Sequence, residues 1–243
     1  MKHLGKYFIF LGSMFRNRES FRTYVRNTLD EMVIIGVDSI VIVTIISTFM
    51  GAVTTVQTAY NLVSPWIQDP IVSLVVRDMT IQELAPTITA IVFAGKVGSN
   101  IAGGLGTMRI TEQIDALEVM GINSSSYLVL PKIIAAMVTF PMLVVLSGFL
   151  SIYGGYITAV ITNVISGPDY LKGIRMDFNP FMVHFALIKA VTFAFIISSV
   201  SSYRGFFTRG GALEVGQSST RAVTSSCIGI LAADYLLSQL LLA

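Results

Sequence analysis

The chain has 243 residues, of which 53% are hydrophobic and only 12% are charged, with a formal net charge of +2. An average soluble domain carries roughly 25% charged residues, so this composition excludes a fully water-exposed exterior and requires a surface that faces hydrocarbon. The small net charge argues against nucleic-acid binding, and the one cysteine, Cys227, excludes a disulfide framework or a cysteine metal cluster.

Residues 1–31 are expected to form amphipathic helices that lie in the membrane interface. Apolar residues follow the i, i+3, i+4, i+7 spacing of a helix, with Lys2 and Lys6 outside the stripe: Leu4, Tyr7, Phe8, Leu11, Met14 and Phe15. Lys6 interrupts the apolar run and no small-residue cleavage site follows it, so we do not predict a signal peptide.

Residues 32–243 are expected to form an all-α membrane domain with five spans. A helix needs about 20 apolar residues to cross the hydrocarbon, and the spans are predicted at about 33–56, 81–106, 133–164, 181–203 and 222–243. The third stretch is longer than a simple span, so it must tilt, bend at Pro141 or project beyond the membrane. The apolar run 71–76 is too short to cross, so residues 60–80 are expected to be a connection that lies at the surface or dips into the membrane.

The second span is rich in small residues at three- and four-residue spacing, which predicts a buried helix that packs closely against others. The residues that carry this pattern are Gly95, Gly98, Ala102 and Gly106. A phosphate-binding loop is excluded, because the positions where its motif requires glycine and serine or threonine hold Ala90 and Val97.

Residues 107–127 are expected to contain a short amphipathic helix between the second and third spans. One helical face gathers Ile110, Ile114, Leu117 and Gly121. The neighbouring arc is acidic and carries Glu112, Asp115 and Glu118. The helix could rest on lipid, but an anionic leaflet would repel these carboxylates, whereas a basic groove on a protein partner would attract them.

Ionisable groups inside the spans are costly and are usually paired or functional. Counted from the cytoplasmic ends, Lys96 and Asp234 lie at a similar depth of roughly 15–18 Å, so we hypothesise that they pair within or between subunits. Lys189 lies nearer the outer surface, where it either meets a lipid phosphate or snorkels to the interface. His3 and His184 fall in unrelated segments, so no catalytic constellation is predicted and the chain is not expected to be an enzyme.

Basic residues set the predicted orientation. Three soluble segments on one side hold eleven of them: Lys2, Lys6, Arg16, Arg18, Arg22, Arg26, Arg109, Lys132, Arg204, Arg209 and Arg221. The other side holds three, namely Arg77, Lys172 and Arg175. This asymmetry predicts a cytoplasmic amino terminus and a carboxyl terminus on the outer side.

Several motifs from about residue 33 onward resemble the MlaE family of ABC transporter permeases. The most specific is the block Thr111-Glu112-Gln113-Ile114-Asp115-Ala116-Leu117-Glu118-Val119-Met120-Gly121. The others are Glu83-Leu84-Ala85-Pro86, Ala94-Gly95-Lys96-Val97-Gly98-Ser99, Gly106-Thr107-Met108-Arg109 and Thr220-Arg221-Ala222-Val223.

This resemblance implies a homodimer of five-span subunits in the bacterial inner membrane, with a phospholipid or related lipid as cargo. It also implies a separate ATP-binding subunit and an outer-side substrate-binding protein with an MCE domain. The segment at about 109–120 would be the coupling helix, and ATP would be bound by the partner, with no cofactor on this chain. The implied coupling residues are Arg109, Glu112, Gln113, Asp115 and Glu118, and the lipid-pocket candidates are Leu84 and Ile88.

One departure from the family pattern limits what can be transferred. Many relatives carry a glutamate where this chain has Gly103-Gly104, so a headgroup role for that residue does not apply here. Two other readings stay open: an ion-coupled secondary transporter that uses Asp38, Lys96, Lys189 and Asp234, and a membrane scaffold without cargo. The odd number of spans and the lack of an internal repeat weigh against the secondary transporter.

Overall fold

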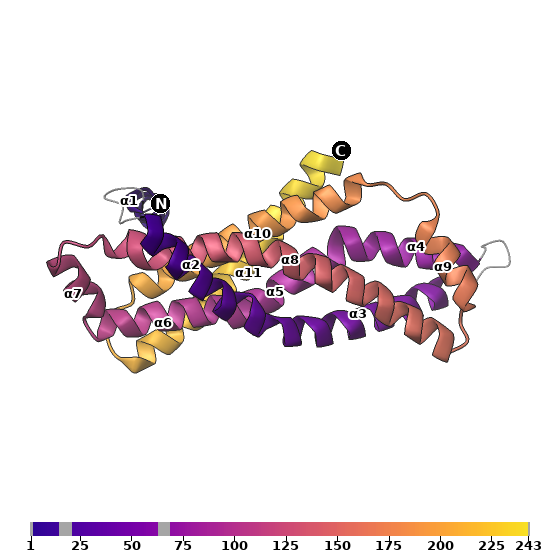
Figure 1. The fold of residues 1–243 in the computed structure, drawn as a ribbon, viewed down its shortest axis with the longest axis horizontal. Helices are drawn as coiled ribbons and strands as arrows, with labels where there is room; N and C mark the ends of the chain where they lie inside the picture. Colours follow the sequence, from indigo (N-terminus) through magenta and orange to yellow (C-terminus); the bar gives the residue numbers. More distant parts are fainter. Residues whose placement is uncertain (1, 15–20, 63–68, 243) are drawn as a thin grey trace. The chain divides into compact units, whose positions relative to one another are not determined.

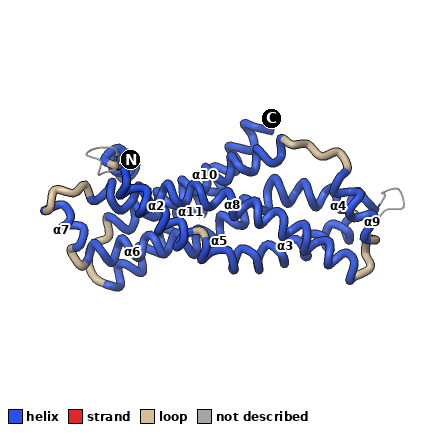
Figure 2. Tube along the Cα trace, in the orientation of Figure 1, coloured by secondary structure: helices blue, strands red, loops and turns tan. Residues whose placement is uncertain are grey.

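Helices make up all the regular structure in the part of the chain that the computed structural model describes, residues 2–14, 21–62 and 69–242 (Figures 1 and 2). The expected all-α fold is therefore confirmed. The α-helices are α1 (Lys2–Ser13), α2 (Phe21–Ile35), α3 (Ile40–Asn61), α4 (Asp69–Met79), α5 (Thr89–Phe93), α6 (Ser99–Ile110), α7 (Gln113–Val119), α8 (Ser124–Ile161), α9 (Gly167–Arg175), α10 (Phe181–Phe206) and α11 (Ala212–Leu242). A 3-10 turn covers Val37–Ser39, and two π-helical segments cover Thr80–Ile88 and Ala94–Gly98.

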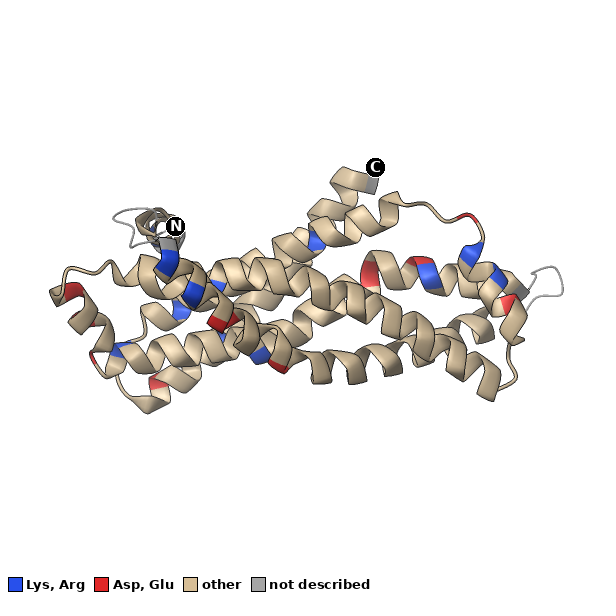
Figure 3. Ribbon diagram, in the orientation of Figure 1, with Lys and Arg blue, Asp and Glu red and all other residues tan. Residues whose placement is uncertain are grey.

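Five helical stretches among the described residues are long and apolar enough to cross a membrane. They are Arg22–Asn61, Pro70–Ile110, Ser124–Ile161, Phe181–Phe206 and Ala212–Leu241. Charged side chains are sparse along them (Figure 3), as hydrocarbon requires. The chain is therefore a multi-pass membrane protein, as the composition predicts.

The second of these stretches begins earlier than the sequence predicts. Residues 69–79 form helix α4, which continues through both π-helical segments to Ile110, so this part of the expected connection is helical. Hydropathy misses α4 because only one of its faces is apolar, and that face is covered by a neighbouring helix instead of lipid. Residues 63–68 lie outside the described part of the chain.

The chain divides into two compact units, each of which is described separately. The first comprises residues 1–39, 90–140 and 191–243, and the second comprises residues 40–89 and 141–190. Helices α8 and α10 each contribute a segment to both units.

In the second unit, α4 lies beside α9 (Figure 1). Their shared core contains Val72, Val76 and the fully buried Tyr170. Gly173 permits the close approach, because a Cβ at this position would lie 2.0 Å from the carbonyl oxygen of Pro70. The buried Arg77 closes the pair of helices: it donates to the carbonyls of Ile174 and Met176 at 2.8 and 2.6 Å and forms an ion pair with Asp78 at 2.7 Å.

Helices α3 and α8 of the second unit also pack closely, through small residues. A Cβ at Gly51 would meet the backbone of Ser151, and one at Gly154 would meet the carbonyl of Thr48. The hydroxyl of Ser151 donates to the carbonyl of Ser47 at 2.8 Å. This is the geometry of membrane helices that associate by close backbone contact and interhelical hydrogen bonds.

In the first unit, α6 and the π-helical segment before it pack against α10 and α11. A Cβ at Gly98 would lie 2.9 Å from the Ser201 hydroxyl, and one at Gly106 would lie 3.2 Å from Val215. Ala102 is fully buried, and its carbonyl lies beside Gly205. A Cβ at Gly95 would meet nothing within 4 Å, so the close contact that the spacing predicts there is not found within this chain.

Helix α1 packs against the end of α10 through an aromatic cluster. The buried Phe10 lies 5.2–5.8 Å, between ring centroids, from Tyr203, Phe206 and Phe207. The Tyr7 hydroxyl lies 2.7 Å from that of Ser199. Burial raises the pKa of Tyr7, and the Ser199 bond only partly opposes this shift. The phenol therefore stays neutral and able to hydrogen-bond.

Candidate functional site

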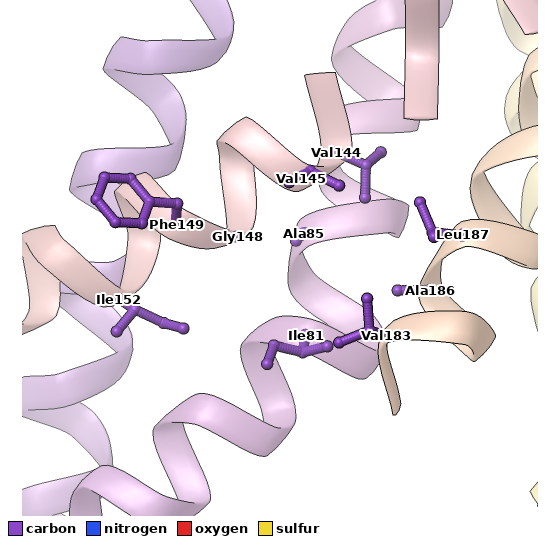
Figure 4. A pocket seen from close by; sticks show the side chains of 10 residues that line it. All are labelled: Ile81, Ala85, Val144, Val145, Gly148, Phe149, Ile152, Val183, Ala186 and Leu187. Carbon is purple, nitrogen blue, oxygen red and sulfur yellow. The ribbon is translucent and has the colours of Figure 1, made fainter. Parts of the chain in front are cut away.

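The second unit contains an apolar cavity of about 150 Å³ (Figure 4). Its walls come from the first π-helical segment, α8 and α10, and Gly148 contributes no side chain to the space. Leu84 and Ile88, the sequence-predicted pocket residues, are half-buried but do not line this cavity. The residues that line it are Ile81, Ala85, Val144, Val145, Gly148, Phe149, Ile152, Val183, Ala186 and Leu187. Such a lining suits a hydrocarbon chain.

The π-helical segment beside the cavity has a local cause in the sequence. In an α-helix the carbonyl of Gln82 would accept a hydrogen bond from the N–H of residue 86, but Pro86 has none. The Gln82 carbonyl instead accepts a hydrogen bond from the Lys189 ammonium at 3.2 Å. π-Helical turns are rare and often mark functional sites. The sequence signal for this turn is Pro86, a proline inside a predicted span.

Lys189 is held in a buried ion pair. Its side chain is fully buried, and the ammonium lies 2.7 Å from the Glu83 carboxylate, whose side chain is 45% exposed. The same ammonium lies 4.5 Å from the centroid of the Phe185 ring. This placement differs from both sequence readings, because the side chain neither extends to the membrane surface nor presents its charge to a lipid in a single chain. The pair joins α10 to the π-helical segment that lines the cavity.

Lys96 lies in the second π-helical segment, in the first unit. It is half-buried, and its ammonium donates to the backbone carbonyl of Asp38. Asp234 is half-buried on α11, and its pairing with Lys96 stays a prediction. Lys96 and Gly104 line a cavity of about 130 Å³, and a Cβ at Gly104 would meet nothing within 4 Å.

The predicted coupling helix is shorter than expected. Arg109 belongs to the end of α6, and the chain then breaks at Glu112, whose φ of 60° is left-handed, before α7 begins at Gln113. Helix α7 is anchored by the fully buried Ile114. Glycine ends the segment as expected, since Gly121 has a φ of 80°.

Two of the three predicted acidic contacts on α7 are engaged within the chain. Asp115 forms an ion pair with Arg109 at 2.6 Å, and Glu118 accepts a hydrogen bond from Ser124 at 2.7 Å. These contacts connect α7 to the end of α6 and to the start of α8. Side-chain contacts therefore tie α7 to the ends of two membrane-spanning helices.

The outer surface of α7 carries a mixed acidic and apolar patch. Glu112 and Gln113 are exposed, and both are among the coupling residues that the family resemblance implies. It did not single out Val119 and Met120, whose side chains are 89% and 66% exposed. A protein partner could cover large apolar side chains that lie beside carboxylates. Their position just before a helix-ending glycine was the signal in the sequence.

The sequence model of the family described as Permease MlaE matches residues 28–240. The chain belongs to the MlaE permease family. A probable ABC transporter permease protein of Rickettsia bellii is 35% identical over 98% of this chain and 91% of its own length. A probable ABC transporter permease protein of Synechocystis is 35% identical over 96% of this chain and 89% of its own. The Arabidopsis thaliana protein TRIGALACTOSYLDIACYLGLYCEROL 1, chloroplastic, is 33% identical over 88% of this chain and 61% of its own.

Membership of the MlaE family makes this chain an ABC transporter permease, a transport component with several apolar helices. The block that carries α7 and the motif that contains Glu83 lie within the matched residues. Lipid transport fits the family. That the chain binds no cofactor of its own stays a prediction.

Proposed function

We propose that this MlaE-family chain is the membrane-spanning subunit of a homodimeric, ATP-driven phospholipid transporter in a bacterial inner membrane. A separate ATPase binds at α7, and a substrate-binding protein with an MCE domain exchanges lipid with the permease on the outer side. The amino terminus lies in the cytoplasm. The exposed patch on α7, between two membrane-spanning helices, is the observation that carries the proposal.

The lipid cargo is supported by the apolar cavity and by the comparisons. The lining of the cavity matches an acyl chain in polarity, and Val145 and Phe149 are 56% and 67% exposed at its edge. A lipid tail can therefore reach the cavity from the bilayer. The name of one relative, from Arabidopsis, contains the name of a glycolipid, trigalactosyldiacylglycerol.

Coupling to an ATPase is supported by the geometry of α7. Glu112, Val119 and Met120 face outward, while Asp115 and Glu118 hold α7 to α6 and α8. A partner whose surface changes during its nucleotide cycle would bind the two states of the permease unequally, which is what a coupled transition requires. The energy of nucleotide hydrolysis would then shift the packing of the spans.

The homodimer is supported by α11. Its apolar side chains are largely uncovered in the single chain, with exposures of 55–77% at Ile228, Leu231, Tyr235, Leu236 and Leu240. A second copy would cover this face with a matching one, as two-fold interfaces do.

Double replacement Val119→Glu with Met120→Glu tests the proposal. The full complex is purified through this subunit, and the co-purifying ATPase and ATP-dependent lipid transfer between vesicles are measured. Burial of each apolar side chain contributes about 1.5–3 kcal/mol, so we expect ATPase retention to fall at least about ten-fold. Leu171→Glu, at an exposed position on α9, is the matched control and keeps the ATPase. Lipid transfer that runs on an ion gradient without any ATPase would overturn the proposal.

A further inference from the structure

A second cavity, of about 230 Å³, lies in the first unit where α10 ends and α11 begins. Three arginines line it: Arg204, Arg209 and Arg221. Because α10 and α11 are both membrane-spanning, their junction lies at the level of the lipid headgroups. The cavity therefore lies where phosphate groups are abundant.

Arginines outnumber carboxylates among the described residues that line this cavity. Among the described residues, none of the three arginines forms an ion pair with a carboxylate. Two of them have neutral partners: Arg204 donates to the Ser225 hydroxyl at 3.1 Å, and Arg221 lies 3.5 Å from the Gln217 amide oxygen.

Glu214 is the one carboxylate in the lining, and it accepts a hydrogen bond from the backbone N–H of Gly211 at 2.8 Å. Three guanidinium groups and one carboxylate leave the described lining of the cavity with a net positive charge. Such a concave positive site attracts an anion, and guanidinium groups match the geometry of phosphate oxygens.

The cavity also has an aromatic wall. Tyr203 and Phe207 line it, with their ring centroids 5.1 Å apart, and both pack against Phe10 of α1. A free phosphate ion would gain nothing from these rings, whereas the glycerol and upper acyl carbons of a lipid would pack on them. Aromatic rings and guanidinium groups in one lining suit the apolar and phosphate parts of a glycerophospholipid.

We propose that this arginine cavity binds the phosphate group of an anionic membrane lipid. The lipid would be a resident of the leaflet that holds the α10–α11 junction, and its site is separate in sequence from the apolar cavity of the second unit. Arg209 and Arg221 are exposed and Arg204 is half-buried, so at least two of the three can reach a headgroup. Arg204 and Arg221 lie on the two helices and hold the phosphate between them.

The test uses the full-length chain in nanodiscs of phosphatidylcholine with a minor fraction of phosphatidylglycerol. Native mass spectrometry measures which lipid stays bound. We expect the wild-type chain to retain phosphatidylglycerol preferentially, and Arg209→Gln to weaken this retention about ten-fold, the effect of one lost charge-assisted hydrogen bond. Arg209→Gln with Arg221→Gln should abolish the preference. Arg26→Gln, at an exposed position on α2, removes the same charge elsewhere and should retain it.

Each other outcome overturns the proposal. Equal retention of the two lipids by the wild-type chain would show that the arginines do not select an anion. An equal loss in Arg26→Gln would show that only total charge matters. If inorganic phosphate or glycerol phosphate displaces the lipid and binds as tightly by itself, the ligand is a soluble phosphate and the lipid assignment fails. Thermal unfolding of every variant in detergent separates lost binding from lost folding.

Discussion

The buried ion pair between Lys189 and Glu83 predicts an asymmetric response to mutation. Replacement of Glu83 by Ala leaves a fully buried ammonium beside the Gln82 carbonyl and the Phe185 ring, without its carboxylate partner. Removing one partner of a buried pair costs about 3–5 kcal/mol. Lys189→Met leaves the Glu83 carboxylate instead, and its side chain is 45% exposed. Solvent screening then reduces the cost to about 1–2 kcal/mol.

The double variant separates these effects. With both charges removed, no buried charge is left unpaired, so Glu83→Ala with Lys189→Met should cost about as much as Lys189→Met alone. The corresponding coupling free energy equals the cost of Glu83→Ala alone, about 3–5 kcal/mol. Each kcal/mol lowers the unfolding temperature of a chain of this size by about 2–4 °C, so Glu83→Ala should lower it by about 6–20 °C.

Thermal unfolding in detergent measures this response, with a thiol-reactive fluorophore that reports exposure of Cys227, the single cysteine of the chain. The side chain of Cys227 is half-buried on α11. The reasoning is refuted if Lys189→Met is at least as destabilising as Glu83→Ala, or if the two single effects simply add in the double variant.

Three further changes give sharp outcomes. Gly173→Ala places a Cβ 2.0 Å from the Pro70 carbonyl and should lower the free energy of unfolding by about 3 kcal/mol. Gly95→Ala meets nothing within 4 Å and should change that free energy by less than about 0.5 kcal/mol. Equal effects of the two variants would contradict the packing described. Ile114→Ala removes the buried anchor of α7, so hydrogen exchange should speed up in α7 before any span, and uniform exchange would argue against a local anchor. Gly148→Leu fills the apolar cavity and should lower the amount of co-purified lipid, and an unchanged amount would place the cargo elsewhere.

Much of the fold follows from hydropathy and spacing alone. The five membrane-spanning helices and the short helix after the second of them are all expected from the sequence. A segment that crosses the hydrocarbon must be helical, apolar and about 20 residues long, and such segments are visible in the sequence. Helix α4 was missed since its apolar face is satisfied by Tyr170 and its neighbours on α9, far away in the sequence. A pattern read along one segment contains no information on such a partner.

The candidate site was less accessible to sequence reasoning. The ion pair of Lys189 joins residues 106 positions apart, and no local pattern connects Lys189 with Glu83. The cavity is lined by Ile81 and Ala85, whereas the family resemblance implied Leu84 and Ile88, because a motif marks a segment and does not show which of its faces borders a cavity. The motif block, by contrast, contains the whole of α7. The ion pair between Asp115 and Arg109 could not be predicted from the block and is known only from the structure.

Site-specific cross-linking at Met120 tests the central claim, that a separate ATPase binds this permease at α7. A photoreactive amino acid replaces Met120, which is 66% exposed, and the intact complex is illuminated in membranes. We expect a cross-link to the ATP-hydrolysing subunit whose yield changes when a non-hydrolysable nucleotide is added. Cross-links to lipid alone, with the same position silent toward every ATPase, would contradict the account.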